Sequence, residues 1–282
     1  MIRHSVQDVT LTDVDIGSAP QARAALIVNA DDWGCSRVVT DRTLDCALSA
    51  VVSSASAMVF MEDSERAADL ARQHDLDCGL HLNLTTSFSA RNCPSRLREQ
   101  QQKVSSFLRT NRLCQAIYHP GLAAAFDYVV RAQREEYQRL YHRPAARIDG
   151  HHHMHLCANV LLQRLLARGT IVRRNFSFRS GEKSGWNRMY RRMIDAALAR
   201  RHRLTDYLFS LVPFEPVERL EYIFSLAEHS IVEVETHPAM LDEYTFLASG
   251  EIFRCYSDIT IADAPAIISS QLGNSRAVLK PV

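Results

Sequence analysis

The stretch AALIVNADD, residues 24–32, is a short apolar run that ends in two carboxylates. Such a run is typical of a strand that is buried on both faces, as in a parallel sheet. A helix is predicted over 36–50, because Leu44, Ala47 and Leu48 fall on one helical face. The stretch decides the fold class, since the same change from strand to helix recurs along the chain.

The later segments repeat this strand–helix unit. Strands are predicted at 53–60, 77–85, 146–149, 169–176, 204–210 and 230–238, with a short apolar run at 276–282. Helices are predicted at 63–74, 122–141, 156–168, 187–203 and 260–271. About seven strands separated by helices favour a single irregular α/β barrel of the (β/α), TIM-barrel-like kind over two open sheets.

The barrel domain is expected to cover residues 23–282, after an N-terminal arm at 1–22 that has little pattern. Between 86 and 121 the periodicity lapses into polar residues broken by Pro94, Pro120 and Gly121. A long segment of this kind predicts an insertion or a lid over the barrel.

The composition is that of an ordinary globular protein. Hydrophobic residues make up 46%, charged residues 23%, and the formal net charge is +1, which excludes a disordered acidic chain and a basic nucleic-acid-binding surface. The arginines at 187–203 alternate with apolar residues at helical spacing, such as Trp186, Met189 and Met193. We therefore expect a helix with a solvated basic face, and no polyanion site.

The seven cysteines are scattered, odd in number and without a C-x-x-C pair. This pattern favours free thiols and a cytoplasmic location. The N-terminus lacks the apolar core of a signal peptide, and no segment approaches the roughly 18 apolar residues of a membrane span.

Polar residues gather where the predicted strands end. Asp31 and Asp32 end the first strand, His81 and Asn83 lie late in the third, and His237 ends the strand at 230–238. The loops after parallel strands converge on one mouth, so these side chains are expected to meet there. Aspartate and histidine are common ligands of a divalent ion, and together these residues favour a metal site.

Each motif alone has a structural alternative. In one interpretation His81 is a hydrogen-bonded core residue. In the other it is a metal ligand that points toward the barrel axis, because Leu80 and Leu82 on the same strand face outward. The pair Asp31–Asp32 either needs a cation or forms a turn before a helix capped by Ser36.

The stretch RIDGHHHMHLC, residues 147–157, places four histidines within five positions. It is either a solvated loop or a helix start with His151 and His155 at metal-compatible spacing.

Four motifs, IVNADDWG, CGLHLNLT, ARIDGHHHMH and VEVETHPAM, occur in this order between residues 24 and 240. Together they resemble the YdjC-type carbohydrate deacetylases, which are related to chitooligosaccharide deacetylase and to the hopanoid-associated YdjC-like proteins. The resemblance implies an irregular (β/α) barrel of the kind found in NodB-type deacetylases. It also implies hydrolysis of an N-acetylated amino sugar to acetate and a free amine.

Residue by residue, the resemblance makes Asp32, His81 and His151 the ligands of one divalent ion, either Mg²⁺ or Zn²⁺. It makes Asp31 the general base and His237 the general acid, and it leaves His152, His153 and His155 around the ligand or facing the substrate. The expected partner is an N-acetylated sugar substrate. Neither a nucleic-acid partner nor a membrane span is expected, and a homodimer is compatible with the resemblance.

Two other functions remain open at this stage. One is a different metal-dependent hydrolase on the same barrel, acting on a phosphoester or a cyclic amide. The other is a non-catalytic homologue that binds sugar.

Overall fold

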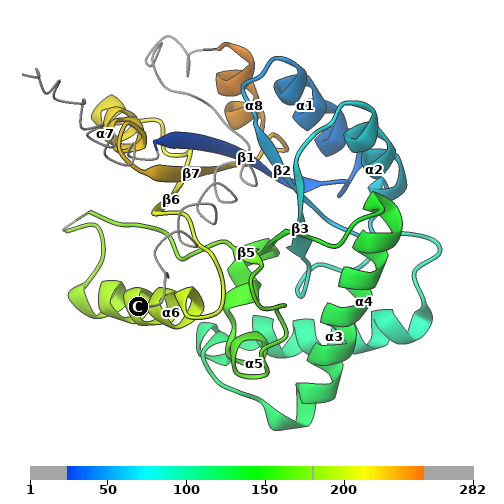
Figure 1. The fold of residues 1–282 in the computed structure, drawn as a ribbon. Coiled ribbons are helices and arrows are strands. Elements are labelled where there is room, and N and C mark those ends of the chain that lie inside the picture. Colours follow the sequence, from blue (N-terminus) through cyan, green and yellow to red (C-terminus); the bar gives the residue numbers. More distant parts are fainter. Residues whose placement is uncertain (1–23, 180, 251–282) are drawn as a thin grey trace, which may run out of the picture.

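The computed structural model describes residues 24–179 and 181–250. Within them the strands form one parallel sheet in the order β5-β4-β3-β2-β1-β7-β6 (Figure 1). The strands are β1 (Ala25–Trp33), β2 (Ser54–Ala57), β3 (Cys78–Leu82), β4 (Arg147–Gly150), β5 (Ile171–Val172), β6 (Tyr207–Ser210) and β7 (Ile231–Thr236).

Helices follow most strands and cover the outside of the sheet (Figure 1). They are α1 (Arg37–Leu48), α2 (Ser64–Gln73), α3 (Ser95–Thr110), α4 (Ala123–Tyr141), α5 (Ala158–Leu162), α6 (Gly185–Ala199), α7 (Val217–Ala227) and α8 (Leu241–Ala248). Three short 3-10 helices are η1 (Arg112–Gln115), η2 (Pro120–Leu122) and η3 (His151–Leu156). None of the helices described is long and apolar enough to cross a membrane.

The sheet curls until its two edges come close. The N–H of Val172, in β5, donates to the carbonyl of Arg203 at 2.9 Å, and the N–H of Ser177 donates to that of Leu208, in β6, at 2.8 Å. The prediction of an irregular (β/α) barrel is therefore confirmed: the fold is a curled, parallel, barrel-like sheet with helices outside.

The alternation of side chains separates an apolar outer layer from a polar interior. On β1 and β7 the side chains of Leu26, Val28, Val232 and Val234 pack in one core cluster with α7 and α8. The residues between them on the same strands include buried Asn29, Glu233 and Glu235. Because neighbours in a strand face opposite ways, these polar side chains line the concave side.

The predicted strands and helices agree with the structure where the pattern is strong and differ where it is weak. The helix expected at 156–168 is the five-residue α5 after η3, and the strand expected at 169–176 is only Ile171–Val172. The side chain of Ser36 caps α1 by accepting from the N–H of Val39 at 3.5 Å. The arm at 1–22, the helix at 260–271 and the run at 276–282 lie outside the described residues.

The segment 86–121 contains a helix that the sequence pattern did not predict. The 16-residue α3 buries Leu97, Val104 and Leu108 in the large core cluster and packs on α4. Its other side chains are mostly polar, and they hide the apolar stripe in the sequence. Part of the segment is thus barrel wall, and η1 after it approaches the candidate site.

Candidate metal and catalytic site

A bulge in β1 brings two adjacent carboxylates to the same site. The pairing of β1 with β2 shifts between Ala30 and Trp33, so two residues of β1 lie opposite one of β2. Asp32 has a φ of 66°, in the left-handed region that non-glycine residues seldom occupy. In a regular strand Asp31 and Asp32 would face opposite ways, whereas the bulge turns both to the concave side.

Asp32, His81 and His151 meet at the carboxyl ends of β1, β3 and β4. One ligand atom from each lies within 4.8 Å of the other two. Oδ1 of Asp32 lies 3.3 Å from Nε2 of His81 and 2.9 Å from Nδ1 of His151. The structure therefore brings together the three residues that the sequence suggested as metal ligands.

Among the residues that the structure describes, the oxygen at the centre of this group has no hydrogen-bond donor. Oδ1 of Asp32 is buried, and despite the short distances neither imidazole reaches it with hydrogen-bond geometry. A buried carboxylate oxygen without a donor is costly, and a cation at this position would compensate it. One carboxylate and two imidazoles fit a divalent ion with open positions.

The charges around His81 lead to the same conclusion. Burial opposes protonation of His81, but the charges of Asp31 and the contacts with Asp149 and Asp32 raise its pKa well above the ordinary value. Burial favours a neutral Asp32, yet its contacts with His151 and His81 lower the pKa of its carboxyl group. The site therefore stabilises positive charge beside Asp32, which a bound cation would also supply.

Asp149 holds His81 in the required orientation. Its Oδ1 lies 2.7 Å from Nδ1 of His81, which directs Nε2 toward Asp32. A carboxylate behind the second ring nitrogen is the usual partner of a metal-binding histidine. In the sequence Asp149 is one polar residue of the stretch 147–157, and its pairing with His81 depends on the register of β3 and β4.

The carboxylate of Asp31 binds a buried arginine. Nη1 and Nη2 of Arg173 donate to its two oxygens at 2.7 and 2.8 Å, and Asn29 donates to Oδ1 at 2.8 Å. Arg173 also donates to Glu233 at 2.7 Å and Glu235 at 3.0 Å. Its fully buried guanidinium thus fixes Asp31 beside the candidate metal ligands.

His237 lies on the other side of Asp31. Its Nε2 is 4.0 Å from Oδ2 of Asp31 and 3.8 Å from Oε1 of Glu235. Glu243 of α8 accepts from the backbone N–H of His237 at 2.8 Å and lies 3.7 Å from Nδ1. Burial opposes protonation, but Glu243, Asp31 and Glu235 raise the pKa of His237 to about 9.

The remaining histidines of the cluster have different surroundings. His155 is fully buried, its Nε2 lies 2.9 Å from the carbonyl of Arg173, and burial lowers its pKa to about 3. It is a structural residue, so the spacing of His151 and His155 does not form a ligand pair. His152 and His153 both have left-handed φ values, 55° and 58°, and point their side chains toward a cavity.

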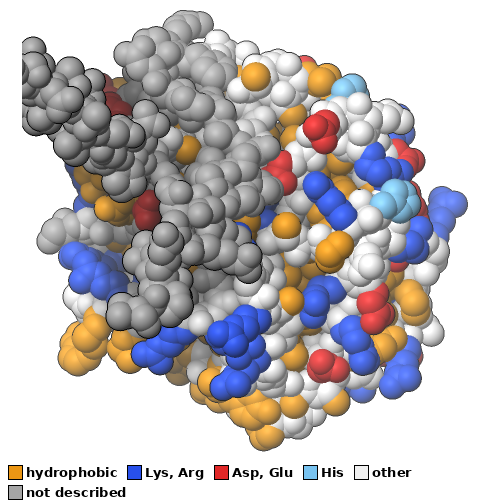
Figure 2. Space-filling view, in the orientation of Figure 1, with side chains coloured by type: hydrophobic (Ala, Val, Ile, Leu, Met, Phe, Trp, Pro, Cys, Tyr) orange, Lys and Arg blue, Asp and Glu red, His pale blue; other side chains and the backbone are white. Residues whose placement is uncertain are grey.

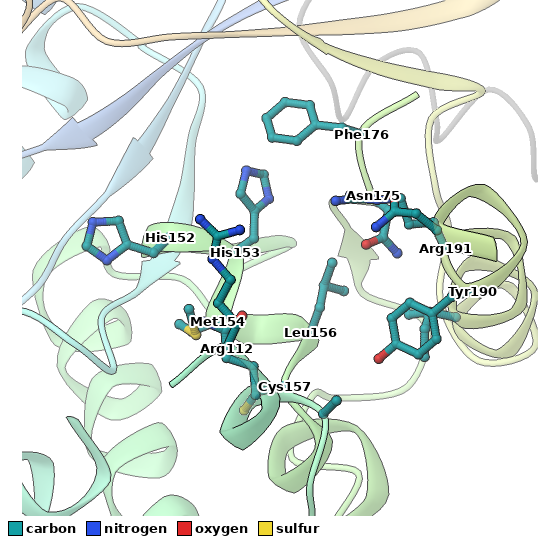
Figure 3. A pocket seen from close by; sticks show the side chains of 14 residues that line it. Arg112, His152, His153, Met154, Leu156, Cys157, Asn175, Phe176, Tyr190 and Arg191 are labelled. Atoms are coloured by element: carbon teal, nitrogen blue, oxygen red, sulfur yellow. Dashed lines mark hydrogen bonds between the residues drawn. The ribbon is translucent and has the colours of Figure 1, made fainter. Parts of the chain in front are cut away.

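The cavity has a volume of about 330 Å³ and opens beside the candidate metal ligands. Figure 3 shows His152 and His153 on one side and Asn175, Tyr190 and Arg191 on the other. The ring of His152 lies 3.9 Å from that of His151, and His153 contacts Phe176 edge-on at 4.5 Å. Polar and aromatic groups therefore line the approach to the site.

Asn83, another polar strand end, is structural. Its Oδ1 accepts from the backbone N–H groups of Thr85 and Thr86 at 3.2 and 2.8 Å. It forms the turn after β3 and does not reach the candidate ligands. The sequence gives no signal that separates this role from that of His81, two residues earlier.

The fold and the site define a class: a barrel-like α/β protein with an Asp-His-His group at the carboxyl ends of its strands, fitted to hold a divalent cation. The family follows from comparison with known proteins. The chain belongs to the YdjC-like protein family, whose model matches residues 25–264.

Curated relatives carry names that concern carbohydrates. A "Carbohydrate deacetylase" of Brevibacillus brevis is 29% identical over 253 residues, covering 85% of this chain and 91% of the relative. A "Chitooligosaccharide deacetylase" of Yersinia pestis is 29% identical over 136 residues, covering 48% of this chain and 52% of the relative.

A solved structure has the same fold. It is described as a putative cellobiose-phosphate cleavage protein from Enterococcus faecalis, with a TM-score of 0.61 and 18% identity. The similarity covers 87% of this chain and 99% of that one.

Proposed function

We propose that this protein is a metal-dependent hydrolase that removes the N-acetyl group from an N-acetylated amino sugar. The products would be acetate and the free amine. The observation that carries the proposal is the group of Asp32, His81 and His151 with Asp31 and His237 beside it. The names of the curated relatives support a carbohydrate as the substrate.

Asp32, His81 and His151 would hold the ion, which we propose to be Mg²⁺ or Zn²⁺. When bound, a divalent ion polarises an acyl carbonyl and lowers the pKa of a water molecule. Two further groups of the described residues could also hold a cation, namely Asp31 with His81 and Asp149, and Asp31 with Glu235 and His237. Both contain Asp31, whose two oxygens already accept from Arg173, so we propose a single ion at Asp32.

Asp31 would act as the general base. It lies next to the ligand Asp32 in the chain, and its Oδ2 is 3.8 Å from Nε2 of His81. The bidentate contact with Arg173 holds its carboxylate in one orientation. A fixed carboxylate can accept the proton of the attacking water.

His237 would act as the general acid. Its raised pKa, about 9, keeps it protonated at neutral pH, where an amine leaving group needs a proton. Its imidazole is partly accessible, with 32% of the side chain exposed, whereas the side chain of Asp31 is buried.

The cavity beside His152 and His153 would accept the sugar. Asn175 and Arg191 offer hydrogen-bond donors, and Phe176 and Tyr190 offer aromatic surfaces. Carbohydrates are bound by this combination, since hydroxyl groups need polar partners and the C–H faces of a sugar stack on aromatic rings. We propose a chitooligosaccharide or a glycan or glycolipid containing N-acetylglucosamine.

Acetate release tests the proposal. The purified chain would be incubated with chitooligosaccharides, N-acetylglucosaminyl lipids and simple acetamides, each with Mg²⁺, Zn²⁺ or chelator. Asp31→Asn should lower kcat by about 10² to 10⁴-fold while the metal content stays unchanged, because a general base contributes about that much. Asp127→Asn, an exposed aspartate on α4, is the matched control and should keep full activity.

Three results would contradict the proposal. Loss of metal in Asp31→Asn would mean that the roles of Asp31 and Asp32 are reversed. Two ions per chain would favour a dinuclear hydrolase. No acetate from any substrate, with metal bound, would favour a sugar-binding protein without catalysis.

A further inference from the structure

Helix α6 packs on the protein through a mixed face, in which Asp195 lies beside the apolar Leu198 and the partly buried Ile194. Asp195 and Leu198 are its buried residues. Asp195 accepts from the backbone and side-chain N–H groups of Asn175 at 3.0 and 2.9 Å and from Arg174 at 3.1 Å. These contacts fix the rotation of the helix about its axis.

The opposite side of α6 is apolar and exposed. In the part of the chain that the structure describes, Trp186 is 78% exposed, Met189 44%, Tyr190 50% and Met193 63%. Their spacing of three and four residues forms one continuous stripe. The helix has the solvated basic residues that the sequence predicts, and its apolar stripe is solvated as well, while Asp195 and Leu198 lie on the inner face.

The stripe lies within a strongly basic segment. Residues 183–203 carry seven Lys or Arg side chains and one carboxylate, that of Asp195, in a chain whose net charge is only +1. Arg192 and Arg200 are both exposed. Figure 2 shows hydrophobic and basic side chains next to each other at the lower left, where Figure 1 places α6.

We propose that α6 is a docking surface for an anionic lipid bilayer. Trp186, Met189 and Met193 would enter the headgroup region, and the arginines would contact acidic headgroups. A helix with an apolar stripe beside basic residues is typical of binding in the plane of the membrane interface. Tryptophan is also favoured at this depth, since its ring is apolar and its N–H is polar.

Other occupants of the surface fit less well. A second copy of α6 would bring two segments of the same positive charge together. A nucleic acid would satisfy the arginines but would leave the methionines without apolar contacts. An anionic bilayer complements both the charge and the apolar stripe.

The docking surface adjoins the cavity of the candidate site. Tyr190 belongs to the stripe and also lines the cavity, together with Arg191 and with His152 and His153 on the other side. Binding through α6 would place the cavity entrance close to the bilayer. The proposed surface does not depend on the reaction, so it stands or falls separately from the proposed function.

Trp186 is a natural reporter for the test. The chain has two tryptophans, and Trp33 is fully buried, so a vesicle-induced shift of emission reports on Trp186. The full chain would be mixed with vesicles of phosphatidylcholine alone or with phosphatidylglycerol. We expect a blue shift and co-sedimentation with the anionic vesicles only, and both should weaken at high salt.

Two double variants keep Trp186 in place. Met189→Ser with Met193→Ser should lower binding at least about tenfold by removing apolar contacts. Arg192→Gln with Arg200→Gln should lower it about fivefold for each arginine. Matched controls are Leu48→Ser with Leu162→Ser, at exposed leucines elsewhere, and Arg131→Gln with Arg134→Gln on α4, which should bind like the unchanged chain.

Several outcomes would overturn the proposal. These are no binding of the unchanged chain to anionic vesicles, equal binding to neutral ones, or equal losses in the control variants. Protection of Trp186 from acrylamide in the free protein would show that the stripe is covered without lipid. A stripe-dependent dimer in size-exclusion chromatography, without vesicle binding, would assign the surface to a second copy.

Discussion

Asp31 and Asp32 are neighbours in the chain but have different electrostatic partners. Asp31 binds the guanidinium of Arg173, whereas Asp32 faces two imidazoles with an oxygen that finds no donor within residues 24–179 and 181–250. Two adjacent carboxylates repel, so each needs its own cation. This difference at the scale of single residues separates a ligand from a base in the proposed mechanism.

His81 provides the test of the metal site. His81→Ala removes one of three proposed ligands, and it should empty the site because one missing ligand of three is poorly compensated. Metal per chain would be measured by elemental analysis after dialysis. His155→Ala is the comparison variant, since His155 is buried in the same cluster but its Nε2 lies against the backbone carbonyl of Arg173, and the variant should keep its metal. Full occupancy in His81→Ala would refute the ligand assignment.

The pKa of His237 predicts the pH above which activity falls. Its folded-state pKa is raised from 6.5 to about 9, so the protonated form predominates at neutral pH. As the pH rises through about 9, a general acid loses its proton, and kcat should fall with it.

The free energy of unfolding should change with pH in the same direction as the activity. The raised pKa contributes to stability fully below pH 6.5, and the contribution is lost as the pH rises through about 9. Glu243→Gln, which removes one carboxylate beside His237, should shift the alkaline limb of the pH–kcat profile downward. A limb that stays in place would show that another group is the acid.

At the scale of elements, the segment 86–121 illustrates a core helix with a polar sequence. Helix α3 buries Leu97, Val104 and Leu108 against the large core cluster, while most of its other residues face solvent. The stripe is too sparse to stand out in the sequence, and packing against α4 supplies its stability. A role as a lid stays a prediction for the part of the segment near the cavity, where η1 contributes Arg112 and Gln115.

Leu108 tests whether α3 belongs to the barrel core. Leu108→Ala should lower the free energy of unfolding by about 2–5 kcal/mol, the usual cost of a cavity at a buried leucine. Leu113→Ala, five residues later and 70% exposed, should change it by less than about 0.5 kcal/mol. Urea titration followed by circular dichroism measures both. Equal effects would mean that α3 is a loosely attached insertion.

At the scale of the molecule, Arg173 joins distant strands inside the barrel. From the end of β5 it contacts Asp31 on β1, Asp149 on β4, and Glu233 and Glu235 on β7. The carboxylates outnumber the guanidinium, and burial raises the pKa of Glu233 despite that contact. The interior of the barrel therefore contains a network of buried ion pairs, where most barrels use branched apolar side chains.

Arg173→Met should destabilise the whole barrel. Removing the cation takes the hydrogen-bonded partner from buried Asp31, Glu233 and Glu235, while Asp149 keeps its contact with Arg147, and such a loss costs about 3–5 kcal/mol. Arg131→Met on α4 is the matched control, because Arg131 forms an exposed pair with Asp127 at 4.0 Å.

If residues 23–282 form one domain, as we propose, fluorescence and circular dichroism should report a single coincident transition in both variants. Two separated transitions would divide the chain into more than one unit.

Much of the fold could be predicted from local patterns. Periods of two and 3.6 residues predict the first strand, the inward direction of His81 between Leu80 and Leu82, and the long helix α4. Short elements such as β5 and α5 were overestimated, because a few apolar residues do not fix where a strand or helix ends.

The sequence by itself determined the class of fold and named the residues that meet at the mouth of the barrel. Only the tertiary structure decided what each of them contacts. Contacts between residues far apart in the chain determine three features: the bulge at Asp31 and Asp32, the pairing of Asp149 with His81, and the inward orientation of Asp195 on α6. Local periodicity shows which way a side chain faces, whereas its partner depends on the register between strands and on the packing between elements.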